Sequence, residues 1–269
     1  RQPRRFRLMR SRARSGANAS QSAADDLLDP IFPYFFLGGI AGGFLCGLSG
    51  FGAGLVTLPI VLFVASPLLA AQLAALAGIA SQIQAIRALR HGLHWRQLLS
   101  IVLAGIVGIA LALWLIPPVP IDLFKFGVGC ILIGYSLFAL AVPATWRFAK
   151  RHPAGNLTAG LLGGLAGGIA GIPGPPVIMW AALQSWSAEE KRSLIQIFNL
   201  VTLSAMLALS AARGRLDDDF IWVGATMLPA IIAGAFLGVA AYRRLNDRRY
   251  QQLVIVLLLI AGITMVMPN

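Results

Sequence analysis

Two clusters of glycine and proline, each set in a long apolar stretch, are the residues most able to bind a solute. The first, SGFGAG at positions 49–54, ends a glycine-rich run that begins at Gly38. The second, GIPGPP at positions 171–176, ends a similar run that begins at Gly160. Glycine costs about 1 kcal/mol and proline about 3 kcal/mol in a helix interior, so each cluster predicts a helix break.

A helix break within a membrane can hold an anion. Lipid cannot satisfy the N–H and C=O groups that a break exposes, so they must face protein or water. The helix after each break, starting near Leu55 or Val177, would direct the positive end of its dipole at the gap. A proline kink without a ligand is the alternative interpretation. Symmetric intramembrane breaks favour a transporter binding site.

The candidate substrate-binding residues lie at the breaks and on neighbouring helices. Gln82 and Asn199 follow the breaks by roughly one helical length and could act as secondary donors. Thr57 could return a hydrogen bond to a freed carbonyl. The complete predicted set is Ser49, Gly50, Phe51, Gly52, Gly54, Thr57, Gln82, Gly171, Ile172, Pro173, Gly174 and Asn199.

The two clusters belong to a longer internal repeat with an offset of 121 positions. Glycines superimpose at this offset, and six of them recur every four residues, a spacing that lets helix backbones approach closely. We expect a basic polar tail at 1–30, membrane repeats at 31–142 and 157–267, and a basic connecting loop at 143–156. The six packing glycines are Gly39, Gly43, Gly47, Gly160, Gly164 and Gly168.

Composition predicts an all-α integral membrane protein. The chain is 58% hydrophobic and only 12% charged, and long apolar runs alternate with short polar loops. We expect about eight transmembrane segments, because two of ten apolar runs, 54–65 and 176–184, are too short to span. The other runs are 31–50, 68–86, 98–116, 124–142, 157–172, 193–211, 220–241 and 250–267.

Charge suggests the orientation. Seven arginines lie within the first fourteen residues, which favours a cytoplasmic tail attracted to anionic lipid. A nucleic-acid arm and an organellar transit peptide are weaker alternatives. The loop charges differ between the halves and hint at inverted repeats. That relationship needs an odd number of crossings per half, which the segment count leaves open.

Ionisable and metal-binding groups are sparse. No acidic or basic residue occupies the middle of a predicted span. Cys46 and Cys130 have no metal-ligand spacing, and the three histidines fall in loops. These patterns predict no metal site, and they disfavour an intramembrane hydrolase, which would need such groups.

The paired motifs GGFLCGLSGFGAGLVTLPIV and GGLAGGIAGIPGPPVIMW resemble the sulfite exporter TauE/SafE family of membrane permeases. The resemblance covers about 32–267. It implies a carrier, usually in the bacterial inner membrane, that often exports sulfite, sulfonates or related organic anions without a cofactor. The expected partners are a small anion and the lipid bilayer, with a homo-oligomer possible and no nucleic acid. A passive anion channel is the main alternative, and a membrane-anchored enzyme or assembly partner is a weaker one.

Overall fold

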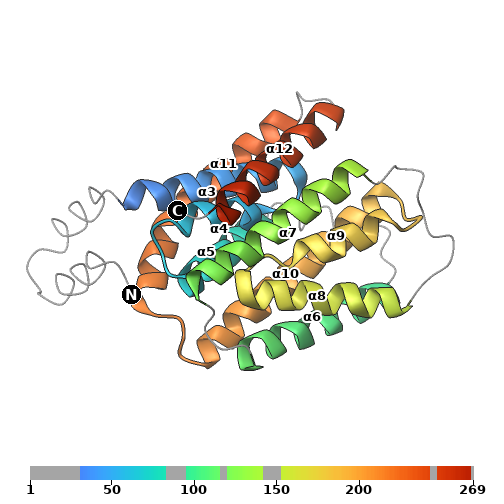
Figure 1. Cartoon of the computed structure of the whole chain (residues 1–269), viewed down its shortest axis with the longest axis horizontal. Coiled ribbons are helices and arrows are strands. Elements are labelled where there is room, and N and C mark those ends of the chain that lie inside the picture. The colour runs from blue at the N-terminus through green and yellow to red at the C-terminus, as the bar shows by residue number, and fades with distance from the viewer. Residues whose placement is uncertain (1–30, 83–94, 116–119, 142–152, 243–246, 268–269) are drawn as a thin grey trace, which may run out of the picture.

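A computed structural model of the 269-residue chain describes residues 31–82, 95–115, 120–141, 153–242 and 247–267. These ranges fold into α-helices, α3 to α12, which pack into one bundle (Figure 1). The predicted tail at 1–30 lies outside the described residues. The helices are α3 Phe32–Ser49, α4 Ala53–Val61, α5 Pro67–Gln82, α6 Trp95–Leu115, α7 Ile121–Ala141, α8 Pro153–Ala170, α9 Gly174–Ala182, α10 Ala188–Ala212, α11 Asp218–Tyr242 and α12 Asp247–Val266.

Each predicted apolar run corresponds to one helix, and the largest differences are at helix starts. Helix α10 begins five residues before its apolar run, because Ser187 and Glu190 form a reciprocal capping box. Helix α8 begins at Pro153, inside the predicted connecting loop. Proline is favoured in the first helical turn, where its missing N–H would have no partner.

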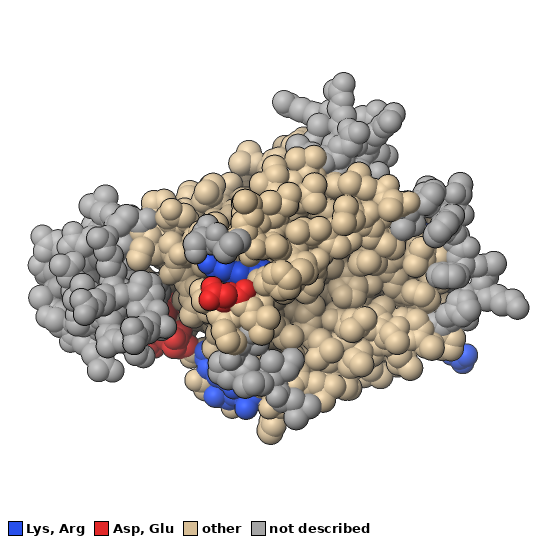
Figure 2. Space-filling model, viewed as in Figure 1, with Lys and Arg blue, Asp and Glu red and all other residues tan. Residues whose placement is uncertain are grey.

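The outer surface of the bundle is suited to lipid. Five described helices, α3, α6, α7, α10 and α11, are long and apolar enough to cross a membrane, whereas α5 has only 16 residues. The face in Figure 2 shows a broad uncharged surface with few described charges. Trp95 and Trp114 lie near opposite ends of α6 and are about 70% exposed. Tryptophan at both ends of a span is typical of the two membrane interfaces.

At each break the chain reverses direction and forms a helical hairpin. A Cβ atom at Gly42 would lie 2.8 Å from the Ala53 carbonyl oxygen, and one at Gly38 would lie 3.0 Å from Val61 Cγ2. Helix α4 therefore runs back along α3. In the second half, Trp180 Nε1 of α9 donates to Asn156 Oδ1 of α8 at 2.8 Å. A simple proline kink within a continuous helix does not describe either break.

Close contacts between helix backbones explain the spacing of the glycines. Cβ atoms at Gly43 and Gly47 of α3 would overlap carbonyl oxygens of α11, and Gly164 of α8 stands in the same relation to Gly105 of α6. The expectation that these glycines serve close helix packing is confirmed. Each of these two helix pairs is parallel, and each joins the first helix of one half to the fourth helix of the other.

Helices at the same place in the two halves pack antiparallel. Gly78 of α5 faces Leu203 of α10, and Gln72, nearer the start of α5, donates to the carbonyl of Arg215 beyond the end of α10. Helices α7 and α12 are also antiparallel, because Gly129 of α7 faces Val266 and the later residue Ile133 faces Gly262. A two-fold axis in the membrane plane would produce such pairing. The division into two repeats stays a prediction, and these contacts favour the inverted form of it.

Candidate functional site

The first junction, residues 49–54, connects α3 to α4 and is a turn stabilised by local hydrogen bonds. Gly50 (φ 79°) and Gly52 (φ 87°) adopt left-handed conformations, which glycine enters without the usual Cβ penalty. The Gly50 N–H donates to the Cys46 carbonyl at 2.6 Å and closes the end of α3. The Ser49 hydroxyl donates to the Leu45 carbonyl at 2.7 Å and accepts from the Phe51 N–H at 3.2 Å. The hydroxyl group of Ser49 therefore stabilises the turn.

The second junction, residues 171–176, connects α8 to α9 and has prolines at positions where the first junction has glycines. Gly171 (φ 68°) closes α8 through an N–H bond to the Gly167 carbonyl at 2.8 Å. Helix α9 starts with Gly174, Pro175 and Pro176. Because proline has no N–H, only Gly174 can donate from these first three positions. The three corresponding residues of α4, Ala53 to Leu55, all carry N–H groups.

Both helix starts face one small cavity. Neither α4 nor α9 has a side-chain cap, so each directs the partial positive charge of its N-terminus at the space that its first residues line. The cavity volume is about 20 Å³, slightly more than the roughly 10–15 Å³ that a water molecule needs. Its lining residues are Phe51, Gly52, Ala53, Gly54, Leu55, Gly78, Gln82, Gly171, Ile172, Pro173, Gly174, Pro175, Ile178, Asn199 and Leu203.

Most of the lining residues form pairs that are 121 positions apart. The junctions supply four such pairs, and α5 and α10 supply two more. In the helix pairs, Gly78 corresponds to Asn199 and Gln82 corresponds to Leu203. Each half therefore contributes one side-chain amide, but from a different position.

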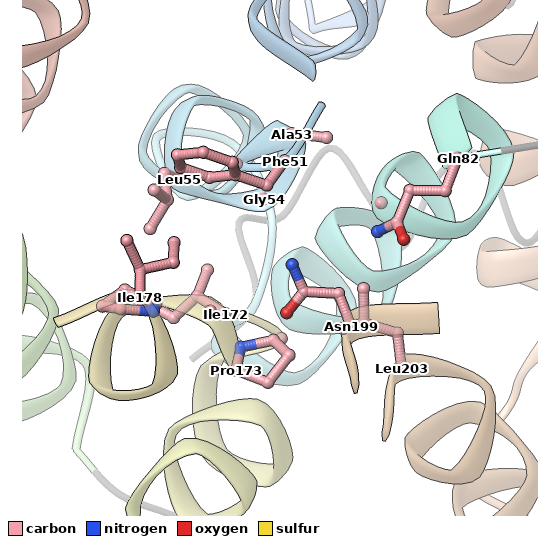
Figure 3. Close-up of a pocket in the computed structure, with 15 residues that line it drawn as sticks. Phe51, Ala53, Gly54, Leu55, Gln82, Ile172, Pro173, Ile178, Asn199 and Leu203 are labelled. Atoms are coloured by element: carbon pink, nitrogen blue, oxygen red, sulfur yellow. The ribbon is translucent and has the colours of Figure 1, made fainter. Parts of the chain in front are cut away.

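The side-chain amides of Gln82 and Asn199 are almost completely buried. Gln82 is 3% exposed and Asn199 is 5% exposed. Among the described residues, Gln82 Oε1 and Asn199 Oδ1 form no hydrogen bond. Figure 3 shows both amides extending toward the region between the junctions. Buried polar atoms are normally paired, so these two oxygens indicate a place for a polar solute or water.

Nine of the twelve predicted site residues line this cavity, and three do not. Ser49 is bonded within its turn, as described above. The Gly50 carbonyl accepts from Gln196 Nε2 at 3.2 Å. Thr57 is fully buried, and its hydroxyl donates to the Gly38 carbonyl at 2.9 Å, which joins α4 to α3. These three residues hold the first hairpin in place.

Sequence reasoning missed two polar residues on α10. Arg192 and Gln196 precede Asn199 by seven and three positions, so all three share one helix face. A Cβ atom at Gly50 would lie 2.9 Å from Arg192 Nε, so the guanidinium lies against the first junction. Helical spacing backwards from Asn199 could have identified both residues. The predicted apolar run began at 193 and left Arg192 out.

The two cysteines are not joined in a disulfide. Cys46 is buried and Cys130 is exposed, and both are free thiols. Within the described ranges, no group of three or more histidine, cysteine or acidic residues could hold a metal ion.

Apolar spans, two helical hairpins and a small cavity between them are features of a multi-pass membrane transporter. The model of the sulfite exporter TauE/SafE family matches residues 34–265, and the chain belongs to this family. The family comprises membrane permeases and not enzymes. Neither a curated protein nor a solved structure gives a significant match to the chain.

Proposed function

We propose that this protein carries a small sulfur oxyanion, such as sulfite or a short sulfonate, across a bacterial inner membrane. The solute binds between the two junctions. The observation that carries the proposal is that both uncapped helix starts and both buried amides meet at one cavity. Backbone N–H groups at helix N-termini bind anions without a cationic side chain.

The size and composition of the cavity favour a solute with few non-hydrogen atoms. A volume of about 20 Å³ accommodates no extended organic chain in this conformation. No lining residue is ionisable, so the negative charge of the ligand would be stabilised by dipoles and hydrogen bonds alone. Sulfite fits this description better than a long sulfonate does.

Alternating access follows from the helix pairing. Antiparallel contacts between α5 and α10, and between α7 and α12, are those expected of inverted repeats. Transporters with such repeats expose a central site to each side in turn by rocking one bundle against the other. The seven arginines of the tail favour a cytoplasmic N-terminus under the positive-inside rule.

Replacing Gly174 with leucine tests whether the cavity is the transport site. A Cβ atom there would lie 3.3 Å from the flexible end of Ile178 and 3.5 Å from the Asn199 amide, without a backbone clash. The rest of the leucine side chain would fill the cavity. We expect Gly174→Leu to insert and accumulate normally, and to lower sulfite flux in liposomes by at least about 100-fold, roughly 2.7 kcal/mol.

Gly127→Leu is the matched control, because no atom lies within 4 Å of a Cβ at Gly127 on α7. This control should transport sulfite at the wild-type rate. Wild-type flux through Gly174→Leu would refute the site.

A channel without alternating access would dissipate a sulfite gradient but would never accumulate sulfite against one.

A further inference from the structure

The unpaired amide oxygens restrict the chemistry of the bound solute. Gln82 Oε1 and Asn199 Oδ1 are acceptors, so each needs a donated hydrogen. A fully ionised oxyanion has none to give. Turning either amide over exchanges its two ends but leaves one acceptor oxygen in the same cavity. The cavity therefore favours a ligand, or a ligand with its water, that carries a hydrogen as well as a negative charge.

A donor lies on the other side of the same cavity. The first turn of α4, Ala53 to Leu55, lines it without a side-chain cap. The Leu55 N–H donates to the Gly52 carbonyl at 3.0 Å and the Ala53 N–H bonds to the Cys46 sulfur, which leaves the Gly54 N–H. This N–H group and the helix dipole favour an ionised oxygen atom at this end. A single solute that contacts both groups needs an ionised oxygen facing α4 and a hydroxyl hydrogen facing an amide oxygen.

The charge environment favours one negative charge over two. Helices α4, α5, α8 and α9 carry no ionisable side chain. Near the cavity, α3 brings the buried thiol of Cys46, and α10 brings Arg192, which lies beyond the lining. The other charged residues of these helices, and of the helices packed against them, lie near helix starts: Arg96 on α6, Asp122 and Lys125 on α7, Glu189, Glu190 and Lys191 on α10, Asp218 and Asp219 on α11, and Asp247, Arg248 and Arg249 on α12. Since the Born cost grows with the square of the charge, a dianion costs about four times as much to desolvate as a monoanion.

We propose that the cavity binds its oxyanion in the singly protonated form, as hydrogen sulfite and not as the sulfite dianion. This inference depends on the proposed function and adds the protonation state of the substrate. The hydroxyl of the ligand donates to Gln82 or Asn199, and an ionised oxygen accepts from the start of α4. Because no cavity-lining residue can hold a proton, the proton that accompanies binding remains on the ligand.

Proton uptake on binding tests this assignment. Sulfite would be titrated into the purified full-length protein in detergent, and the heat of binding would be measured in two buffers that differ in ionisation enthalpy. The difference between the two heats gives the number of protons taken up. One pH unit above the second pKa of sulfite, where the dianion dominates, we expect close to one proton to be taken up per anion bound. One pH unit below that pKa, we expect almost none.

Two variants locate the proton. The double variant Gln82→Met with Asn199→Leu keeps similar side-chain sizes but lacks both acceptors, so proton uptake above the pKa should fall and affinity should weaken by about tenfold. Cys46→Ala changes a buried side chain outside the cavity lining and should retain full proton uptake, and loss of uptake in this variant would overturn the inference. Equal binding of sulfite at both pH values without proton uptake would also overturn it. So would a requirement for sodium, because the amide oxygens would then bind a cation.

The failure of this inference is distinguishable from failure of the proposed function. Sulfite binding and transport without proton uptake would leave the carrier assignment standing and remove only the protonated form. Absence of sulfite binding and transport at both pH values would remove both.

Discussion

The two junctions occupy equivalent places in their halves but are built for different tasks. Both close a helix with a left-handed glycine, Gly50 in one and Gly171 in the other. After that glycine, the first junction continues with residues that carry N–H groups, and the second continues with prolines. The first junction therefore has more backbone N–H groups, one of which already donates from Leu55 to the Gly52 carbonyl, and the second has fewer N–H groups and a backbone restricted by proline.

The helices behind the two junctions differ in the same way. Gly50 faces Arg192 and Gln196 on α10, whereas Gly171 faces the backbone of Ala71 on α5. Ala71 and Arg192 are themselves 121 positions apart. One junction thus lies against long polar side chains that can move, and the other lies against a fixed carbonyl. The two junctions therefore have similar backbone conformations, but the first borders polar side chains and the second is closely packed against backbone.

The largest expected effect tests the difference in packing. In Gly171→Ala the new Cβ would overlap the Ala71 carbonyl oxygen, and the left-handed backbone would be strained as well. In Gly50→Ala the nearest atoms are the ends of flexible side chains, so the main cost is backbone strain of about 1–2 kcal/mol. We expect Gly171→Ala to lose about 3 kcal/mol or more.

Thermal unfolding and the monodisperse yield in detergent would measure both variants. The comparison predicts a clearly lower Tm and yield for Gly171→Ala than for Gly50→Ala. Equal losses would mean that the two junctions have the same packing tolerance, and the proposed contrast would then be wrong.

A smaller effect is expected at Arg192, which should attract anions to the first junction. Of the described residues, none forms a salt bridge that would neutralise this guanidinium, and it lies against Gly50 outside the cavity lining. Arg192→Ala should raise the KM for sulfite by about 3- to 10-fold at low ionic strength and leave kcat unchanged. The difference should shrink as salt screens the charge.

The adjacent cation provides a control for Arg192. Lys191 donates to the Ala182 carbonyl at 3.4 Å, so Lys191→Ala removes the same charge near the same helix start without touching the junction. Arg192→Lys should recover most of the affinity. An equal rise in KM for Lys191→Ala and Arg192→Ala would assign the effect to net charge and remove the special position of Arg192.

Much of this architecture could be predicted from residue patterns. The apolar runs indicated the helices because lipid-facing and buried positions are both apolar, and the break residues are those that helices tolerate least. The spacing of Gly43 and Gly47 indicated close packing, although the partner helix, α11, lies about 190 residues further along the chain. Sequence distance gives no information on such a pairing.

Other features depend on contacts that sequence patterns do not record. The orientation of the halves depends on whether α4 and α9 turn back, and the length of a short apolar run does not decide that. Thr202 lies three residues after Asn199, but its hydroxyl bonds to the Phe198 carbonyl of its own helix at 2.6 Å. Serine and threonine often form this bond within helices, so a polar residue near the site on the same helix need not face the cavity. The site role of the nine lining residues remains a prediction.

The most direct test of the central claim is to locate a bound oxyanion. Selenite has the shape of sulfite, and its selenium atom scatters anomalously, so crystals of the intact protein soaked with it would reveal its position. We predict an anomalous peak between Gly54 and Gly174, with oxygen atoms within hydrogen-bonding distance of the Gln82 and Asn199 amides. A well-occupied peak elsewhere, with this cavity empty, would contradict the account.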